Sequence, residues 1–342
     1  MTEIRRRHVR FVPGIGRREW FTILLLGVEI VVFGFVSENF FTGQNLATVL
    51  RNSTHLAIVA IGMNIVMLMG GVDISVGPAM GIVAIIAGWM LIAGVSPWLI
   101  FPVAIATGIV IGLVNGLIIT RGRVPDIIAT LGMMNILRAT VFAMLGGRWL
   151  TGLSGDFATL TAGDIVGVPT PAWLLVLFFG VFWFILTYTR FGRRVYAIGN
   201  STEAAELAGI DVRAVRTVGY GVLGGLVGFS ALLYVGRLGS VEITVGMALH
   251  IEAIAAVVLG GTSVKGGSGN LIGTLAGVLF MAVLRNGVVL LGIPSLWERA
   301  VIGFLILVSV GVDFLLSARR AERRRVQLAF DKGLTADEGD RR

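Results

Sequence analysis

The sequence contains few of the residue patterns that support enzyme chemistry. A Walker A motif needs a lysine after a glycine-rich loop, and neither of the two lysines, Lys265 and Lys332, stands in that pattern. The three histidines, His8, His55 and His250, are far apart and lack metal-ligand spacing. The chain has no cysteine and no G-x-S-x-G nucleophile elbow. We therefore expect no ATPase activity of its own, no metal site and no cofactor.

Polar residues inside apolar stretches are more informative, because they are costly in a membrane and usually face a bundle interior or a water path. Amides and hydroxyls can exchange hydrogen bonds with water-like polar groups of a ligand at little net cost. For each asparagine, an interhelical hydrogen bond is the simpler alternative, and the sequence leaves both roles open. The candidates for a translocation path are Asn64, Asn115, Asp126, Thr130, Asn135 and Asn286.

Ionisable residues in the apolar part of the chain allow two kinds of role. Asp73 stands in a glycine-rich segment, where an Asx-type bond from its carboxylate to nearby backbone would order the turn. Arg138 and Arg285 could pair with acidic residues of neighbouring helices, and the sequence does not say which. Asp73, Asp126 and Glu252 are also the acids that an ion-coupled transporter would need.

The composition is that of a membrane protein. Of 342 residues, 56% are hydrophobic and 14% are charged, against about 25% charged residues in soluble domains. The net charge is +8, but the arginines cluster at the ends of apolar segments, which is the positive-inside pattern and argues against nucleic acid as a partner. Small residues spaced by four predict close helix packing. Such glycines are Gly108, Gly112 and Gly116, Gly221 and Gly225, Gly224 and Gly228, and Gly273 and Gly277.

Apolar stretches and polar links predict an all-α polytopic membrane protein with about ten transmembrane helices. The basic segments 1–19 and 317–342 are expected in the cytoplasm, with a transmembrane domain over 20–316. The link 146–170 is expected in the periplasm and the loop 190–216 in the cytoplasm. Glycine pairs follow the second and eighth helices, so either could be broken or re-entrant. The expected helices are 20–36, 46–69, 76–94, 98–119, 125–145, 171–188, 215–236, 247–260, 270–292 and 297–316.

The loop 190–216 contains a short helix that the sequence caps at both ends. Asn200 is a suitable N-cap, and Glu203 stands three residues later, where its carboxylate could reach back to the backbone of the cap. Gly209 can adopt the left-handed conformation that ends a helix. The helix is either a docking element for a cytoplasmic partner or part of a loop whose arginines only fix topology. Its small apolar face consists of Ala204, Ala205, Leu207 and Ala208.

Two glycine-rich segments are weakly similar to one another, GGVDISVG at 70–77 and GGTSVKGG at 260–267. Each follows an apolar helix and precedes a glycine-rich one, and paired interruptions of this kind often mark a transport pathway. Tight turns are an equal alternative, because glycine is the usual turn residue. The glycine-break residues are Gly70, Gly71, Asp73, Ser75, Gly77, Gly260, Gly261, Gly266 and Gly267.

Four motifs together resemble the permease subunits of bacterial sugar ABC importers, such as the ribose, xylose, rhamnose and autoinducer-2 permeases. The resemblance covers nearly the whole chain from the second to the tenth expected helix, and GGRWLTGL at 146–153 is particularly similar to the autoinducer-2 type. The sequence departs from the family at Asp126, where relatives often carry an apolar or aromatic residue. The motifs are GGVDISVG (70–77), NGLIITRGRVPDIIATLGMMNILRA (115–139), AIGNSTEAAELAGI (197–210) and LGGTSVKGGSGNLIGTLAGVLFMAVLRNGV (259–288).

The resemblance implies a type II ABC importer-like permease fold with glycine-broken helices in the bacterial inner membrane. It also implies a second permease copy, two cytoplasmic ABC ATPase subunits, a periplasmic sugar-binding protein and surrounding lipid. ATP-driven closure of the ATPases would act on a coupling loop and switch the path between two states, so specificity should lie mainly in the binding protein. By similarity Gly199, Asn200, Ala204, Ala205 and Gly209 fall on this loop, and Glu203 joins them as the expected capping carboxylate.

We therefore expect the non-catalytic permease subunit of an ATP-driven importer for a sugar or sugar-like solute of the pentose, deoxyhexose or autoinducer-2 type. The main alternative is an ion-coupled secondary transporter, whose uptake would follow a proton gradient and ignore ATP. A passive channel would conduct without a partner, and a membrane enzyme would need catalytic groups that the sequence lacks. The sequence does not name the substrate.

Overall fold

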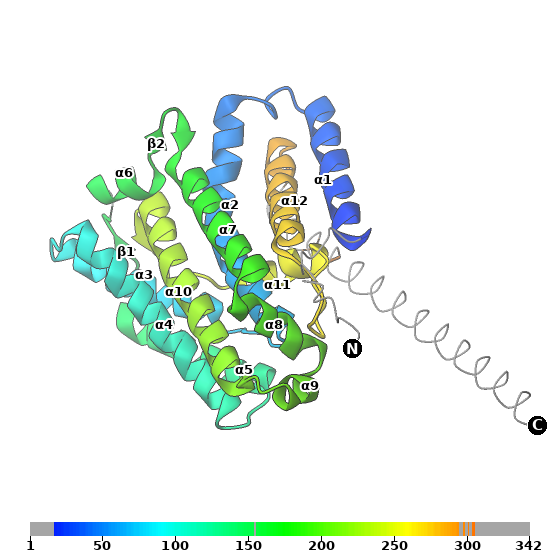
Figure 1. Cartoon of the computed structure of the whole chain (residues 1–342). Coiled ribbons are helices and arrows are strands. Elements are labelled where there is room, and N and C mark those ends of the chain that lie inside the picture. The colour runs from blue at the N-terminus through cyan, green and yellow to red at the C-terminus, as the bar shows by residue number, and fades with distance from the viewer. Residues whose placement is uncertain (1–16, 154, 294–296, 298–299, 301–302, 305–342) are drawn as a thin grey trace, which may run out of the picture. The chain divides into compact units, whose positions relative to one another are not determined.

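The computed structural model describes residues 17–153, 155–293, 297, 300, 303 and 304 (Figure 1). Contacts divide the chain into two units, Met1–Ile293 and Pro294–Arg342, and every element named below belongs to the first. The expected tenth helix and the two basic termini lie largely outside the described residues. The helices are α1 (Arg17–Val36), α2 (Gly43–Leu68), α3 (Val76–Ile92), α4 (Pro97–Thr120), α5 (Asp126–Leu145), α6 (Asp156–Ala162), α7 (Thr170–Tyr188), α8 (Arg190–Asn200), α9 (Thr202–Leu207), α10 (Val212–Leu238), α11 (Leu249–Leu259) and α12 (Leu271–Leu290).

The expected all-helical membrane architecture is confirmed, and the first nine expected spans correspond to α1–α5, α7 and α10–α12. Among the described residues, seven helices are long and apolar enough to cross a membrane: α1, α2, α4, α5, α7, α10 and α12. The apolar helix α3 has 17 residues and α11 has 11. At 1.5 Å per residue, α11 is about 16 Å long, roughly half of the 30 Å hydrocarbon core. Of the two helices for which the sequence leaves a break open, α11 is therefore too short to span by itself, whereas α2 is continuous over 26 residues.

Helix α10 lies at the centre of the first unit and packs against α2, α3 and α4. Its contact with α4 is a backbone-to-backbone approach between glycines. A Cβ on Gly108 would lie 2.1 Å from the carbonyl oxygen of Gly224, and a Cβ on Gly112 would lie 2.2 Å from that of Tyr220. A Cβ on Gly228 would lie 2.3 Å from the carbonyl oxygen of Ala104. The close packing that the four-residue glycine spacing predicts is confirmed at this crossing.

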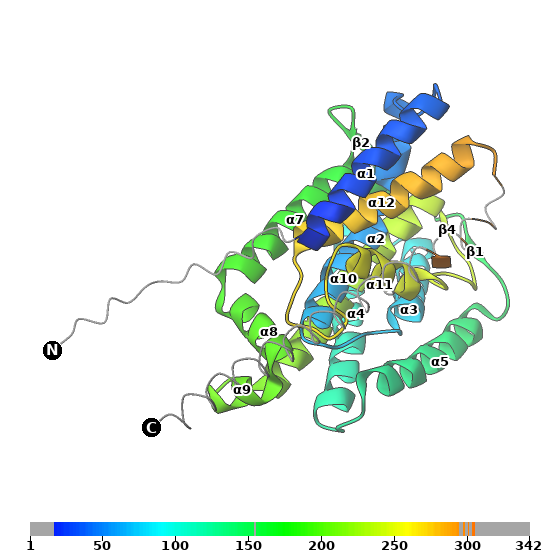
Figure 2. The same cartoon turned by 90° about the vertical axis from the view of Figure 1, so that its right-hand side faces the viewer.

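A second group of helices consists of α1, α11 and α12, and α12 also packs on α2 (Figures 1 and 2). Glycines again set the approach: a Cβ on Gly277 would lie 2.1 Å from the carbonyl oxygen of Ala256, and one on Gly273 would lie 1.9 Å from that of Gly260. On the α1 side, the ring of Phe33 fills the space over Gly287. The short helix α11 is thus held along its length by α12.

The polar link after α5 is partly structured. Its β1 (Leu150–Thr151) pairs with β4 (Ser240–Val241), which follows α10, and this antiparallel pair ties the two connections together. A hairpin of β2 (Asp164–Ile165) and β3 (Val168–Pro169) follows α6. In both views this hairpin lies at the opposite end of the helices from α8 and α9.

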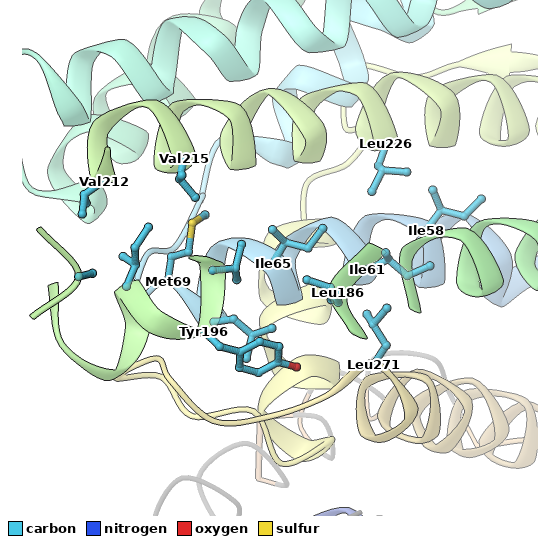
Figure 3. Close-up of a cluster of buried hydrophobic side chains, with 14 of the residues drawn as sticks. Ile58, Ile61, Ile65, Met69, Leu186, Tyr196, Val212, Val215, Leu226 and Leu271 are labelled. Atoms are coloured by element: carbon cyan, nitrogen blue, oxygen red, sulfur yellow. The ribbon is translucent and has the colours of Figure 1, made fainter. Parts of the chain in front are cut away.

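A buried apolar cluster joins α8 to the membrane helices (Figure 3). It combines side chains from six segments: Ile58, Ile61, Ile65 and Met69 of α2 and its C-cap, Leu186 of α7, Tyr196 of α8, Ala205 of α9, Val212, Val215 and Leu226 of α10, and Leu271 of α12. Helices far apart in the sequence therefore meet where α8 begins the link to α10. This cluster gives α8 a fixed position.

Candidate functional site

Helix α8 lies on the other helices through one apolar face. Thr189 caps it by accepting a hydrogen bond from the backbone N–H of Gly192 at 3.4 Å. Val195, Tyr196 and Ile198 are buried, whereas the arginines of the same helix, Arg190, Arg193 and Arg194, are exposed. The helix thus presents a basic outer face and packs its inner face into the cluster of Figure 3.

Tyr196 fixes the inner face of α8 to a distant loop. Its hydroxyl donates to the carbonyl oxygen of Gly269 at 2.9 Å, in the segment between α11 and α12. Burial, with the nearby carboxylate of Glu19 as a smaller cause, raises the pKa of Tyr196 to about 12. The phenol is therefore neutral at physiological pH and remains a hydrogen-bond donor.

The short helix α9 forms where the sequence predicts it, but its cap is different. Ser201 is the N-cap and its hydroxyl accepts from the backbone N–H of Ala204 at 3.2 Å. The prediction that Asn200 caps this helix is wrong, because Asn200 is the last residue of α8. Glu203 is consequently the second residue of α9, one position too early for the expected capping box. Gly209 has φ of 78° and ends the helix, as predicted.

The apolar face of α9 is divided between two directions. Ala205 is 3% exposed and belongs to the buried cluster under α8. Its assignment to a docking face for a partner is therefore wrong, because this chain itself covers the side chain. Leu207 is 91% exposed, and Ala204 and Ala208 are exposed beside it. The surface that a partner could contact is the outer face with Leu207.

The end of α8 lies against both glycine-rich segments at once. A Cβ on Gly199 would lie 1.9 Å from the carbonyl oxygen of Leu68 and 2.4 Å from the backbone nitrogen of Gly267. Gly267 donates its N–H to the carbonyl oxygen of Leu68 at 2.9 Å, and the side-chain amide of Asn200 donates to the carbonyl oxygen of Gly267 at 3.3 Å. Three motifs that are far apart in the sequence form one contact, which we call the glycine junction: 68–71, 199–200 and 265–267.

Left-handed backbone makes this junction possible. Gly70, Gly266 and Gly267 have φ of 78°, 86° and 75°, which favours glycine. Gly261 is also left-handed, with φ of 91°. A Cβ on Gly266 would lie 2.7 Å from the backbone nitrogen of Gly70, so the two segments touch directly. Both segments are therefore turns that pack on one another, and the hypothesis that they mark a transport pathway stays a prediction.

Polar side chains order the turn that follows the first glycine pair. The carboxylate of Asp73 accepts from the backbone N–H of Ser75 at 2.8 Å and from its hydroxyl at 2.7 Å, as the predicted Asx-type bond requires. Asn115 of α4 donates to Asp73 at 3.1 Å and to the hydroxyl of Ser75 at 2.8 Å. All three residues are buried. This cluster fastens the start of α3 to α4.

Asp126 lies beside the same turn. It is the first residue of α5, hydrogen-bonded to Tyr220 and close to the charge of Arg216. Arg216 donates to the carbonyl oxygen of Met69 at 2.9 Å. A Cβ on Gly71 would lie 2.8 Å from both the Asp126 carboxylate and the Tyr220 hydroxyl. Asp126 therefore connects α5 and α10 to the glycine junction.

Two other path candidates hold helices together. The amide of Asn64 donates to the hydroxyl of Thr262, within the second glycine-rich segment, at 2.7 Å and to that of Thr274 in α12 at 2.8 Å. Asn286 of α12 and Asn45 of α2 exchange amide hydrogen bonds of 2.7 Å and 3.0 Å. These are the interhelical hydrogen bonds that the sequence left open as an alternative.

The remaining polar residues of α5 and α12 differ in position. Thr130 is buried and its hydroxyl donates to the carbonyl oxygen of Asp126 at 2.8 Å. Asn135 is exposed and donates to the carbonyl oxygen of Leu131 within its own helix. Arg285 pairs with Glu252 at 2.9 Å, which confirms the expected pairing with an acid of a neighbouring helix. In the described ranges, no group of three or more His, Cys, Asp or Glu side chains is arranged to hold a metal ion.

Comparison with known proteins shows the family to which the chain belongs. A family model described as "Branched-chain amino acid transport system / permease component" matches residues 45–310, which is more than half of the chain. The chain belongs to this permease family. The predicted membership of the permease group to which sugar ABC importers belong is confirmed.

The permease is similar to named transport proteins over most of its length. It is 38% identical to the ribose import permease protein RbsC of Escherichia coli K12 over 296 residues, covering 85% of this chain and 92% of that protein. Identity to RbsC of Haemophilus influenzae is 34% over 310 residues, covering 90% and 95%. The autoinducer 2 import system permease protein LsrC of Escherichia coli O9:H4 is 32% identical over 300 residues, covering 86% of each. No solved structure gives a significant match.

Several contacts of the permease were not predicted from its sequence. Ser201 is as favourable an N-cap residue as Asn200, so the sequence alone also allows the helix to begin one residue later. Tyr196, Arg216 and Thr262 act through long-range hydrogen bonds to loops or helices elsewhere in the chain. No local pattern marks such partners, because the fold alone brings them together.

Proposed function

We propose that this chain is the permease subunit of an ATP-driven importer that moves a monosaccharide or a sugar-like solute across the bacterial inner membrane. Its family, its apolar spans and its similarity to ribose and autoinducer 2 permeases support this proposal. The sequence contains no Walker A motif, so the energy would come from a separate cytoplasmic ABC ATPase. The chain then supplies the path and takes no part in the hydrolysis.

The observation that carries the proposal is the glycine junction. Gly199 leaves no space for even a Cβ between the end of α8 and the two glycine-rich segments. A displacement of α8 must therefore move the end of α2 and the loop between α11 and α12 with it, because packed interiors transmit strain instead of absorbing it. The junction would transmit a movement of the surface helix α8 to the two glycine-rich segments that interrupt the membrane helices.

The outer face of α9 is the surface that the ATPase would contact. Leu207 is almost fully exposed, and burying its apolar side chain in a partner interface would remove that surface from water and favour association. The exposed arginines of α8 flank this surface, and by the positive-inside rule they support a cytoplasmic position for it. Gly199, Asn200, Glu203, Ala204 and Gly209 contribute the fixed geometry of the coupling loop, with Ala205 as its internal anchor.

The remaining partners follow from the same proposal. A second permease copy would complete the path, and a periplasmic sugar-binding protein would deliver the solute at the end of the helices with the β2–β3 hairpin. ATP binding would favour one of two states of the path by its differential affinity for them. The permease path needs only weak affinity for the solute, since the binding protein selects it.

A substitution on α9 tests the docking surface. Leu207→Asp should reduce co-purification of the ATPase and abolish ATP-driven uptake, because the exposed carboxylate would have to be desolvated in the interface. The chain should fold and insert normally, since Leu207 contacts solvent and not the core. Leu160→Asp on α6, at the opposite end, is the matched control and should keep the ATPase bound. Unchanged co-purification with Leu207→Asp would contradict the docking role of α9.

A further inference from the structure

A cavity of about 210 Å³ opens between three elements of the first unit. Its walls are Pro78 near the start of α3, the α5 side chains Arg138, Val141 and Phe142, and the loop segment 243–247 that follows β4. At about 30 Å³ for each water molecule, the volume corresponds to about seven waters. This is room for one small organic molecule, and most of the lining is apolar.

Arg138 is the charged side chain in this lining. It lies twelve residues into α5, about 18 Å from the first residue of the helix at 1.5 Å per residue, and therefore within the membrane core. Arg138 is exposed on this chain and makes no ion pair within the described residues. An arginine facing lipid at this depth is costly, so such residues usually face a water-filled cavity or another protein surface.

The walls of the cavity are held at fixed distances. The backbones of Gly77 and Gly246 are in direct contact, because a Cβ on Gly77 would lie 2.1 Å from the carbonyl oxygen of Gly246. Val141 and Val245 both pack over Gly81 of α3. The β1–β4 pair anchors the loop segment at its other end. A preformed space of this kind can bind a ligand without first reorganising.

The chemistry of the lining indicates the ligand class. The guanidinium of Arg138 offers several donors in a fixed plane, which suits the oxygens of neighbouring hydroxyl groups. The ring of Phe142 and the side chain of Met247 provide an apolar surface for the C–H face of a sugar ring. The hydroxyl of Thr244, a lining residue, donates to the carboxylate of Glu242 at 3.2 Å, so an acceptor is close to the lining. Donors, an acceptor and an apolar wall together match a monosaccharide.

We infer that this cavity is a solute site of the permease, in which Arg138 contacts the hydroxyl groups of a single monosaccharide during its passage. The inference rests on the proposed function and adds a location and a contact residue to it. Pro78 follows Gly77 directly, and the first glycine-rich segment begins at Gly70 in the glycine junction. A bound solute would therefore lie close to the first glycine-rich segment, through which α8 would act. Solute binding and movement of α8 would then affect the same part of the structure.

Labelling of an introduced cysteine tests the inference, because the natural chain contains none. Met247→Cys places a thiol in the cavity lining, and Val166→Cys at the exposed tip of the β2–β3 hairpin is the control. The full-length variants in lipid nanodiscs are labelled with a charged methanethiosulfonate reagent, with D-ribose, D-xylose or L-rhamnose as protecting probes and maltose as a larger control. At a sugar concentration ten times its dissociation constant, labelling at position 247 should slow about tenfold, and labelling at position 166 should not change.

The contribution of Arg138 is measured in the same assay. Arg138→Gln in the Met247→Cys background should weaken protection about tenfold or more, since charge-assisted hydrogen bonds exceed neutral ones. Arg148→Gln, an exposed arginine just beyond α5, is the matched control and should leave protection unchanged. Equal protection in both variants would overturn the role assigned to Arg138.

A parallel measurement separates this inference from the proposed function. ATP-driven uptake of the same sugars is followed in vesicles that contain the permease, its ATPase and its binding protein. Uptake without protection by any monosaccharide overturns the cavity site and leaves the proposed function standing. Protection without ATP-driven uptake supports the site and removes the proposed function. If there is neither protection nor ATP-driven uptake, both the cavity site and the proposed function are overturned.

Discussion

Gly199 leaves less space for a Cβ than almost any other described glycine of the first unit, with the carbonyl oxygen of Leu68 at 1.9 Å from the position of a Cβ. The atoms on the other side are backbone atoms of Gly267, which cannot rotate away as a flexible side chain could. At this scale the junction is defined by the absence of side chains. Its stability and its ability to transmit movement both depend on that absence.

An alanine at this position tests the contact. Gly199→Ala should destabilise the protein by about 1–3 kcal/mol, the usual cost of overpacking, and should reduce transport more than this loss explains, because α8 would be pushed off both turns. Gly180→Ala in α7 is the control: nothing lies within 4 Å of its Cβ, and alanine favours the helix. Thermal unfolding of the purified variants measures both effects. A Gly199→Ala protein as stable and active as the Gly180→Ala protein would contradict the close contact.

Two asparagines that the sequence grouped as path candidates provide a second test. Asn115→Ala should cost about 1–3 kcal/mol of stability, since it removes the amide that donates to buried Asp73 and Ser75. Asn135→Ala should change stability by less than about 0.5 kcal/mol, because its side chain is exposed and bonds only within α5. Both are measured by thermal unfolding in the same detergent. Equal losses would contradict the different environments of the two amides.

At the scale of elements, the sequence predicts where α9 forms, but it predicts neither the helix α8 before it nor how the two helices are buried. The helix signals at 200–209 were correct in place, and Gly209 ends α9 as expected. The N-cap was wrong by one residue because Asn200 and Ser201 are equally good caps, and the choice depends on the amide of Asn200 reaching Gly267. The burial of Ala205 could not be predicted, since it requires the inner face of α8 and the start of α10 to meet.

The glycine segments show the same limit more clearly. Their composition predicts turns or breaks, and their left-handed residues confirm the turns. The hydrogen bond from Gly267 to Leu68 joins positions about 200 residues apart. Gly199, which touches both, is about 130 residues after Leu68 and about 70 residues before Gly267. No periodic pattern encodes such a distance. Helix packing by glycines spaced by four was predictable for α4 and α10 because the spacing itself creates the groove.

At the scale of the whole molecule, the acids that an ion-coupled transporter would need are already engaged. Asp73 is bonded to Ser75 and Asn115, Glu252 is paired with Arg285, and Asp126 is bonded to Tyr220. These interactions stabilise the fold at the turns and between helices. They favour a permease whose conformational change is driven by a partner protein through α8 and α9. They argue against one that is driven by ion binding at these residues.

The central claim is that energy enters this chain from ATP hydrolysed by a partner. The direct measurement is sugar uptake into vesicles that contain the permease, its ATPase and its binding protein, with ATP supplied on the cytoplasmic side and, separately, with an imposed proton gradient. The account predicts uptake that requires ATP, persists when the gradient is collapsed, and is lost in Leu207→Asp. Uptake that follows the proton gradient in the absence of ATP would contradict it.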